Sequence, residues 1–328
     1  MANLIYKYNK LKYKILCIVN LFILLKNLDY LINNNEKENI KVCICTIGKQ
    51  ENSYIREYIE YYKNYGVDKI FLYDNNDING ENFGVIISDY IKSNYVELFN
   101  YRGLSRIQNK INLDCYKSNY KKYNWLIFYD LDEYINLKYY NNIKDFLNKK
   151  KFNKCNTIYL NWVIHTDNNL IYYDIRPLRE RFTEIILDKK YCIGKTIIRG
   201  NIKDINIKSC HLIDKNIKPK CNGFGQIITS LGIRCPLPTY IYYIHHYRFK
   251  STEEYLNKIS RGDCLLGNNN RIKYDKLYKY FIFNKINPSK INFINNSYGL
   301  NITKLKEYLK EKKMDKRYFN LNKKMKLF

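Results

Sequence analysis

The sequence predicts an α/β fold whose mostly parallel sheet is flanked by helices, and three observations support this. Short apolar runs alternate with segments of helical periodicity from residue 41 to residue 162. A series of this β-α-β kind implies right-handed crossovers and parallel strands. The run Trp-Leu-Ile-Phe-Tyr at 125–129 is apolar throughout, which is typical of a strand buried on both faces. Polar residues follow the expected strands, where open α/β sheets bind their ligands.

The first expected strand, at 41–47, leads through a short loop into a helix that Asn52 or Ser53 can cap. Apolar residues in this helix recur at intervals of three and four, and Gly66 stands where the helix should end. The same criteria give the later elements. Strands are expected at 69–73, 96–99, 125–129 and 157–162, and helices at 83–92 and 108–120.

The chain divides into three expected parts: an N-terminal helical or linker segment at 1–40, an α/β domain at 41–265, and a basic, helical C-terminal extension at 266–328. Ser-Thr-Glu-Glu at 251–254 matches a capping box and should begin a helix. The basic segment at 301–328 suits an amphipathic helix. A solvated basic face is its default interpretation, and peripheral contact with an anionic membrane is the alternative.

Composition favours a packed protein with anionic partners. Hydrophobic residues make up 46% of the chain and 35 residues are tyrosines, which is enough for a folded core and excludes a disordered protein. The chain has 57 basic and 31 acidic residues, a net charge of +26, which favours nucleotides, phosphorylated substrates, nucleic acid or anionic lipid. Much of the excess is spread as single lysines, so charge is weak support for nucleic-acid binding.

The ten cysteines lack both a CxxC pair and the Cys/His spacing of a zinc site. Cys43 and Cys45 alternate within the first expected strand, where cysteine acts as a small apolar residue. We therefore expect most cysteines to be reduced core thiols, as in a cytoplasmic protein. The apolar run at 15–25 is too short to span a bilayer, so we expect a core or membrane-surface helix there.

Asp130 and Asp132 follow the most apolar expected strand, at positions i and i+2. Carboxylate oxygens at a strand end suit Mg²⁺ or Mn²⁺, which proteins commonly share with substrate phosphates. A plain acidic turn explains the pair equally well on its own. The sequence has neither GxGxxG nor GxxxxGK[ST], so a metal, and not a glycine-rich loop, is expected to hold a diphosphate.

A series of blocks resembles the metal-dependent GT-A glycosyltransferases, specifically glycosyltransferase family 92 and the family 2-like group. The most specific blocks are Asp-Leu-Asp-Glu at 130–133 and His-Tyr-Arg-Phe-Lys-Ser at 246–251, the latter followed by Arg-Gly at 261–262. The other blocks lie at 49–51, 54–57, 66–75, 101–103, 114–115, 181–183 and 195–199, with Gln108, His211 and Lys258. The resemblance spans residues 41–265 and implies a GT-A fold.

The resemblance implies transfer of a hexose from a nucleotide-diphosphate sugar, usually UDP-linked, to a glycan hydroxyl, and we expect inversion. Mn²⁺ is the expected metal and Mg²⁺ the alternative, because imidazole suits Mn²⁺ better. The implied metal ligands are Asp130, Asp132 and His246, with His211 ranked behind His246. The residues expected to bind the nucleotide sugar are Thr46, Glu51, Asp74, Gln108, Asp130, Lys195 and Arg199.

The catalytic base stays open among several carboxylates, because an inverting transfer needs one within hydrogen-bond reach of the acceptor hydroxyl. Asp167 and Glu180 are the first candidates, ahead of Glu184 and Asp263, and a surface charge or salt bridge is the structural alternative for each. Residues 163–167 lack the glycine-bearing turn usual in the family, so we expect His165 or Asp167 to replace its contacts.

Two other functions fit part of the sequence. A metal-dependent nucleotidyltransferase would use the same acidic pair with a glycine-rich phosphate loop, but residues 45–51 contain one glycine. A non-enzymatic nucleic-acid-binding protein would interleave basic and aromatic residues on one face, whereas the aromatic residues here follow apolar strand and helix positions. We therefore predict a cytoplasmic glycosyltransferase, with membrane association as an option and with no nucleic-acid partner.

Overall fold

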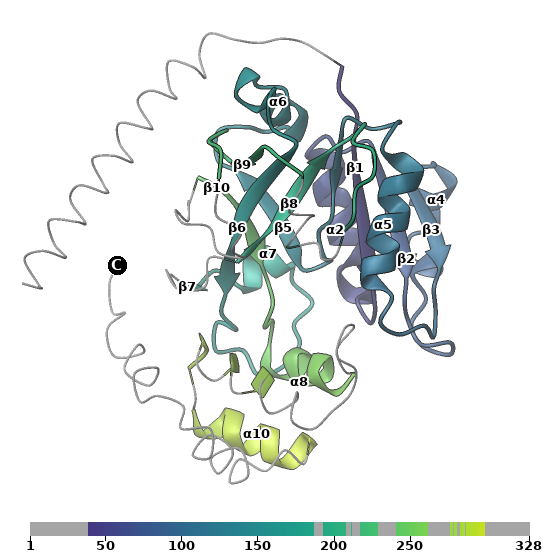
Figure 1. The fold of residues 1–328 in the computed structure, drawn as a ribbon. Helices are drawn as coiled ribbons and strands as arrows, with labels where there is room; N and C mark the ends of the chain where they lie inside the picture. The colour runs from purple at the N-terminus through teal and green to yellow at the C-terminus, as the bar shows by residue number, and fades with distance from the viewer. Residues whose placement is uncertain are drawn as a thin grey trace, which may run out of the picture.

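The computed structural model describes residues 39–186, 193–207, 211, 217–228, 241–261, 276–277, 279–280, 283–285 and 287–298. A single large sheet forms the centre of these residues, with helices on both of its faces (Figure 1). The strands are β1 (Val42–Gly48), β2 (Lys69–Asp74), β3 (Val96–Asn100), β4 (Trp125–Ile127), β5 (Glu133–Leu137), β6 (Thr157–His165), β7 (Ile185–Ile186), β8 (Gly194–Arg199), β9 (Lys220–Asn222) and β10 (Tyr242–His246). The helices are α2 (Asn52–Asn64), α3 (Phe83–Ile86), α4 (Ser88–Lys92), α5 (Gln108–Asn119), α6 (Ile143–Leu147), α7 (Leu178–Arg181), α8 (Thr252–Ser260) and α10 (Pro288–Tyr298), with a 3-10 turn η1 (Lys150–Phe152).

The strand order is β3-β2-β1-β4-β8-β6-β10-β5, with β7 and β9 also paired to β6. From β3 to β4 the neighbouring strands are parallel. Strand β8 is antiparallel to both β4 and β6, β10 is parallel to β6, and β5 is antiparallel to β10. The prediction of an α/β fold with a mostly parallel sheet flanked by helices is confirmed.

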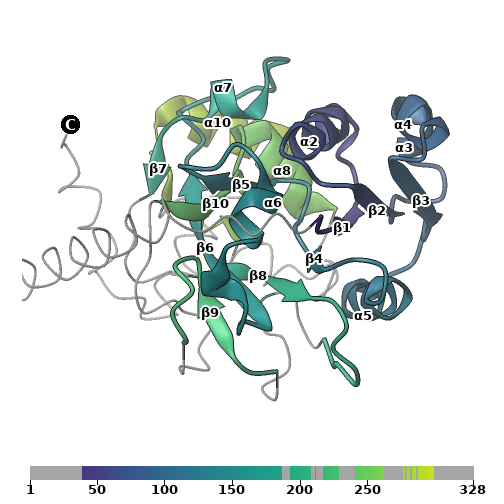
Figure 2. The ribbon, with the colours of Figure 1, turned by 90° about the horizontal axis from the view of Figure 1, so that it is seen from above.

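Helices α2 and α5 cover opposite faces of the parallel half of the sheet (Figure 2). The sequence of β1 explains this arrangement, because successive side chains of a strand point to opposite faces. Val42 and Ile44 pack with the apolar stripe of α2, whereas Cys43 and Cys45 pack with the apolar residues of α5. The strand is therefore buried on both faces, as its unbroken apolar sequence predicts.

Two elements differ from the expectation. Strand β4 ends at Ile127, and the chain leaves the sheet three residues before the acidic pair. A hydrogen bond from the Glu133 amide to the Asp130 carbonyl (3.0 Å) closes the turn that follows, and β5 begins there. The expected helix at 83–92 is two short helices, α3 and α4, because Ile87 between them takes a non-helical φ of −119°.

The prediction that most cysteines are reduced is wrong for four of the five that the structure describes. Disulfides join Cys45 to Cys115 and Cys155 to Cys221, with sequence separations of 70 and 66. The first fastens β1 to α5, and the second fastens the segment before β6 to β9. Only the fold brings these partners together, so the spacing along the chain could not show them. Cys43 is buried and free, as expected, and the other cysteines lie outside the described residues.

The described part of the C-terminal segment, which follows residue 265, packs on the α/β domain. Ile294 of α10 is fully buried in a cluster with Leu256 and other apolar residues of α8, which Figure 1 shows beside it. The Lys290 ammonium lies 2.5 Å from Asp167 Oδ2, and both side chains are buried. These contacts favour a domain that extends to residue 298, which we propose in place of the boundary at 265.

Among the described residues, each helix is too short or too polar to cross a membrane. The segments for which membrane contact was considered, at 15–25 and 301–328, lie outside the described residues.

Candidate active site

Polar residues gather at the carboxyl ends of β1, β2 and β4, which are parallel and share one edge of the sheet. Asp74 is the last residue of β2, and Glu51 follows β1 at the start of α2. The turn at 130–133 follows β4. Its Asp132 carbonyl accepts a hydrogen bond from the Tyr247 amide (2.9 Å), which ties the end of β10 to the turn.

Asp132, Glu133 and His246 form a buried group whose potential ligand atoms lie within 4.8 Å of one another. The His246 Nε2 is 3.7 Å from Asp132 Oδ1, and the ring packs on Trp162 with centroids 4.2 Å apart. Burial lowers the pKa of His246 well below its usual value, against the opposing effect of Asp132, so the imidazole is neutral and able to bind a metal. Its Nδ1 is buried without a hydrogen-bond partner among the described residues. Two carboxylates and an imidazole suit Mn²⁺.

Asp130, the third predicted metal ligand, is not part of this group. Its carboxylate lies 2.8 Å from the Lys195 ammonium and accepts a hydrogen bond from the Gln108 side chain (3.3 Å). Lys195 is fully buried and its ammonium is also 3.3 Å from Glu133 Oε2, so one lysine contacts two carboxylates of the turn. The structure therefore brings together three of the predicted donor-binding residues.

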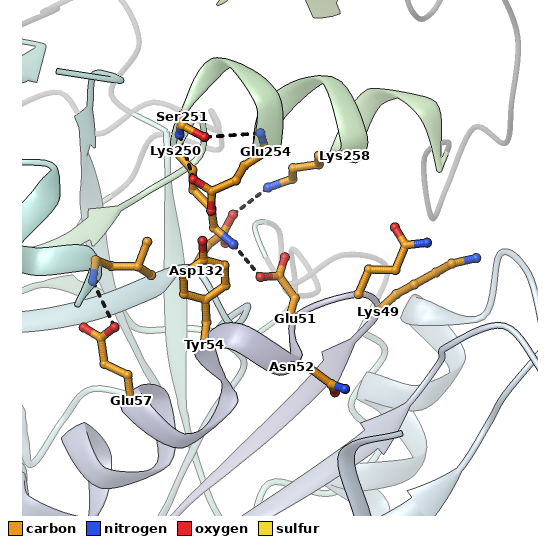
Figure 3. A network of polar contacts seen from close by, with 12 residues as sticks. Lys49, Glu51, Asn52, Tyr54, Glu57, Asp132, Lys250, Ser251, Glu254 and Lys258 are labelled. Atoms are coloured by element: carbon orange, nitrogen blue, oxygen red, sulfur yellow. Dashed lines mark hydrogen bonds and ion pairs between the residues drawn. The ribbon is translucent and has the colours of Figure 1, made fainter. Parts of the chain in front are cut away.

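Helix α8 supplies a cation to Asp132 of this group (Figure 3). It begins with a capping box, in which the Ser251 hydroxyl accepts from the Glu254 amide (3.3 Å) and the Glu254 carboxylate accepts from the Ser251 amide (3.1 Å). Farther along the helix, the Lys258 ammonium lies 2.6 Å from Asp132 Oδ2. Burial raises the pKa of Asp132, but Lys258 and the other nearby cations outweigh burial and hold that pKa well below its usual value.

Glu51 is tied to the residues at both ends of α8. It forms a buried ion pair with Lys250, and the Arg261 guanidinium lies 3.4 Å from its carboxylate. Lys250 has a φ of 53°, in the left-handed region that residues other than glycine rarely adopt. Such a backbone persists only where its surroundings fix it, so packing holds the Lys250 backbone in place, and the ion pair with Glu51 holds its ammonium.

Asp74 lies at the predicted edge and is already hydrogen-bonded. It accepts from the Asn76 amide (2.9 Å) and side chain (2.8 Å), and the Arg102 guanidinium is 3.3 Å away. Thr46 differs, because it is buried within β1 beside the Tyr58 hydroxyl. Of these two predicted donor-binding residues, Asp74 is the one that lies at the strand end.

A sequence comparison matches residues 38–298 to Glycosyltransferase family 92. The chain belongs to glycosyltransferase family 92. The match confirms the resemblance carried by the sequence blocks, and it makes the protein a glycosyltransferase. No curated protein matches the chain.

Solved structures similar to this family 92 chain include S. aureus TarS, with 12% identity and a TM-score of 0.32. That match covers 80% of this chain and 46% of TarS, so the chain spans less than half the length of TarS. TarS 1–349 in complex with UDP-GlcNAc has 13% identity and a TM-score of 0.34, covering 80% of this chain and 77% of that one. The mannosyltransferase PcManGT from Pyrobaculum calidifontis, in complex with GDP-Man and Mn2+, has 7% identity and a TM-score of 0.40, covering 89% and 81%.

Arg199 lies away from the acidic turn of this family 92 enzyme. Strand β8 is antiparallel to β4, and its register sets Arg199 opposite Trp125, the first residue of β4. The Arg199 guanidinium lies over the Trp125 ring at 4.2 Å and donates to the main-chain carbonyls of Phe152 and Cys155. It is therefore engaged at the edge of the sheet opposite the strand ends, and the prediction that it binds the donor has no support in these contacts.

The two candidate bases have different surroundings in the family 92 fold. Asp167 is buried, and its carboxylate contacts the Lys290 ammonium and the Tyr280 hydroxyl of the C-terminal segment. Those contacts fit the structural alternative of a salt bridge. Glu180 lies in the first turn of α7, and its side chain is exposed.

The other described histidines have partners of their own. His165 Nε2 and His245 Nδ1 are 2.7 Å apart. Burial lowers the pKa of His165 to about 3 and of His245 to about 4, so both rings are neutral. His245 thus contacts β6 while its neighbour His246 faces the acidic turn, as strand alternation predicts. His211, the second-ranked metal ligand, is 2.8 Å from the Gly194 carbonyl through its Nδ1.

No site role was predicted from the sequence for Glu133 and Lys258, or for the two cations that contact Glu51. The signal for Glu133 was its place beside Asp132 in the most specific block. The signal for Lys258 was its position seven residues after Ser251, because the capping box fixes where the helix begins and residues seven apart share a helix face.

Proposed function

We propose that the protein transfers a hexose from a nucleotide-diphosphate sugar to a glycan hydroxyl, with inversion and with a divalent metal. The observation that carries this proposal is the buried group of Asp132, Glu133 and His246 beside the carboxyl ends of the parallel strands. A bound Mn²⁺ would supply Lewis-acid stabilisation of the departing nucleoside diphosphate. A UDP-linked donor is our first expectation, because it is usual in the family that the chain resembles.

The protein's own residues would hold the nucleoside across the ends of β1 and β2. Glu51 and Asp74 offer carboxylate oxygens there, and Asp130 with Gln108 lies on the adjacent side of the turn. Lys195 is a fixed, buried cation, and fixed cations are most effective where negative charge develops on a leaving group. Thr46 would act indirectly, from within β1, by supporting the loop that follows the strand.

The metal and the acidic turn are tested by measuring nucleotide release from UDP- and GDP-hexoses with glycan acceptors, before and after EDTA treatment. We expect EDTA to abolish turnover and Mn²⁺ to restore it. Asp132→Asn should reduce kcat by about 100-fold or more, because it removes a ligand carboxylate. The matched control is Asp89→Asn, which breaks a surface ion pair between Asp89 of α4 and Arg56 of α2. Full turnover in EDTA would contradict metal dependence, and a fully active, folded Asp132→Asn enzyme would contradict the site.

For the catalytic base we favour Glu180 over Asp167, because the Asp167 carboxylate is occupied by a buried ion pair. Glu180→Gln is expected to lower kcat by about 10²–10⁴-fold and leave the KM for the donor unchanged, as the loss of a general base does. Asp167→Asn should act on stability instead. If Glu184→Gln abolishes turnover and Glu180→Gln does not, the assignment to Glu180 is wrong.

The two disulfides also bear on the compartment in which the enzyme works. Disulfides between structural cysteines persist in oxidising compartments and are rare in the cytoplasm. The cytoplasmic prediction depended on reduced cysteines, so we propose an oxidising compartment in its place. Mass spectrometry of the alkylated protein from its own cells is the test, and free Cys45, Cys115, Cys155 and Cys221 thiols would overturn this proposal.

A further inference from the structure

Lysines already neutralise the candidate metal group. The Lys258 ammonium is 2.6 Å from Asp132 Oδ2, and the Lys195 ammonium is 3.3 Å from Glu133 Oε2. Counted with their immediate partners, four carboxylates face four cations in the described part of the site. The carboxylates are Asp130, Asp132, Glu133 and Glu51, and the cations are Lys195, Lys258, Lys250 and Arg261.

This balance works against a divalent cation. The formal charges of these eight described side chains sum to zero, so they offer a metal no excess of negative charge. Lys258 also contacts one oxygen of Asp132 directly, which leaves Oδ1, the oxygen nearer His246. A metal that takes Asp132 as a ligand must therefore compete with the Lys258 ammonium at short range.

The two lysines differ in how easily each can leave its carboxylate partner. Lys195 belongs to β8 and its side chain is fully buried between two carboxylates. Lys258 extends from α8 toward Asp132 (Figure 3), and 29% of its side chain is exposed. A lysine ammonium sits on a flexible four-carbon stem, so a partly exposed lysine can exchange its partner for water or for another anion.

We propose that Lys258 is a built-in competitor of the divalent cation at Asp132 and that it sets how tightly the metal binds. When the metal enters, the ammonium leaves Asp132 and becomes available to an anionic group of the donor. This inference rests on the proposed function, because it takes the group of Asp132, Glu133 and His246 to be the metal site.

The test is Mn²⁺ binding to the purified full chain without substrate, followed by the electron paramagnetic resonance signal of free Mn²⁺. Lys258→Met and Lys258→Gln should bind Mn²⁺ at least about tenfold more tightly than the natural protein, because a unit charge close to the metal is removed. Lys258→Arg keeps the charge and should bind Mn²⁺ as the natural protein does. Lys144→Met is the matched control, since the Lys144 ammonium is 2.5 Å from Asp68 Oδ1 and 28% of its side chain is exposed.

The melting temperature with and without Mn²⁺ gives a second readout that holds even if a Lys258 variant is less stable without metal. A larger rise on adding Mn²⁺ in Lys258→Met than in the natural protein supports the proposal, because a ligand that binds only the native state stabilises it in proportion to its affinity. Equal Mn²⁺ affinity in the natural protein and the Lys258 variants would overturn the proposal and leave the metal site intact. No Mn²⁺ binding in any of these proteins would overturn the metal site and this inference together.

Discussion

At the scale of single residues, two adjacent histidines of β10 have opposite surroundings. His246 faces Asp132, with Nε2 3.7 Å from Oδ1, whereas His245 contacts His165 across the neighbouring strand. Both rings are neutral because burial lowers the pKa of each. Neutral imidazole is the form that binds metals, so position and not protonation decides which of the two could bind a metal at Asp132.

His246→Ala is therefore expected to weaken Mn²⁺ binding by about tenfold or more, since even residues that only orient metal ligands contribute about 10–100-fold. Isothermal titration with Mn²⁺ measures the effect. His245→Ala is the control from the opposite face of the same strand and should keep the affinity of the natural protein. An equal loss in both variants would mean general disruption of β10 and would contradict the ligand assignment.

The role of a residue could be predicted only where the sequence also showed at which end of its strand the residue lies. Lys195 and Arg199 lie in one strand, and both were predicted to bind the donor. Four residues of a strand span about 13 Å, so Lys195 and Arg199 lie near opposite ends of the same strand. The antiparallel register of β8 sets Lys195 beside Asp130 and Arg199 opposite Trp125, and no local pattern carries that register.

At the scale of elements, α10 is held by a buried ion pair as well as by apolar contacts. Lys290 has no exposed side chain, and its ammonium contacts Asp167 Oδ2 and the Lys285 carbonyl. Asp167 also accepts a hydrogen bond from Tyr280, and Asn284 accepts one from the Asp167 amide (2.7 Å). A candidate catalytic carboxylate is thus the anchor of a C-terminal helix.

Lys290→Met should lower the free energy of unfolding by roughly 3–5 kcal/mol, because it leaves the buried Asp167 carboxylate without its cation. Urea denaturation measures this loss. Lys285→Met is the matched control, since Lys285 is 4.0 Å from Glu184 and both side chains are largely exposed. Its effect should stay within about 1 kcal/mol. A Lys290→Met protein as stable as the Lys285→Met protein would support the shorter domain at 41–265.

The elements best predicted from sequence are those whose pattern is local. Strands β1, β2 and β3 and helix α2 lie where apolar runs and helical periodicity set them, and the Ser251 capping box begins α8 as expected. The early end of β4 and the pairing of β5 with β10 depend on contacts between distant segments. A tight turn closed by Asp130 and Glu133 reverses the chain after β4. The apolar run at 125–129 does not indicate that the strand ends at Ile127.

At the scale of the whole molecule, two disulfides close loops of similar size. In the chain-entropy description, a disulfide that closes a loop of 70 residues raises the free energy of unfolding by about 4 kcal/mol. Natural disulfides contribute about 2–5 kcal/mol each. Replacing Cys155 and Cys221 together by alanine should lower the free energy of unfolding by about 2–5 kcal/mol. Chemical denaturation with and without a reducing agent measures it. Cys43→Ala is the control, because this buried thiol is free and its loss should leave the effect of reduction unchanged. Insensitivity of the natural protein to reduction would contradict the disulfides.

The two covalent loops, 45–115 and 155–221, do not overlap, and the turn at 130–133 lies in the open stretch between them. A protease that cuts inside a loop, for example beside Ile78 with 74% of its surface exposed, would leave both pieces attached through the sulfur bridge. Such a nicked chain would run as one band on a denaturing gel until a reductant is added. A cut between the loops would release two fragments at once. For these two disulfides of the described residues, paired gels therefore distinguish a cut inside a loop from a cut outside both loops, and a single cut in the segment that carries the acidic turn separates one loop from the other.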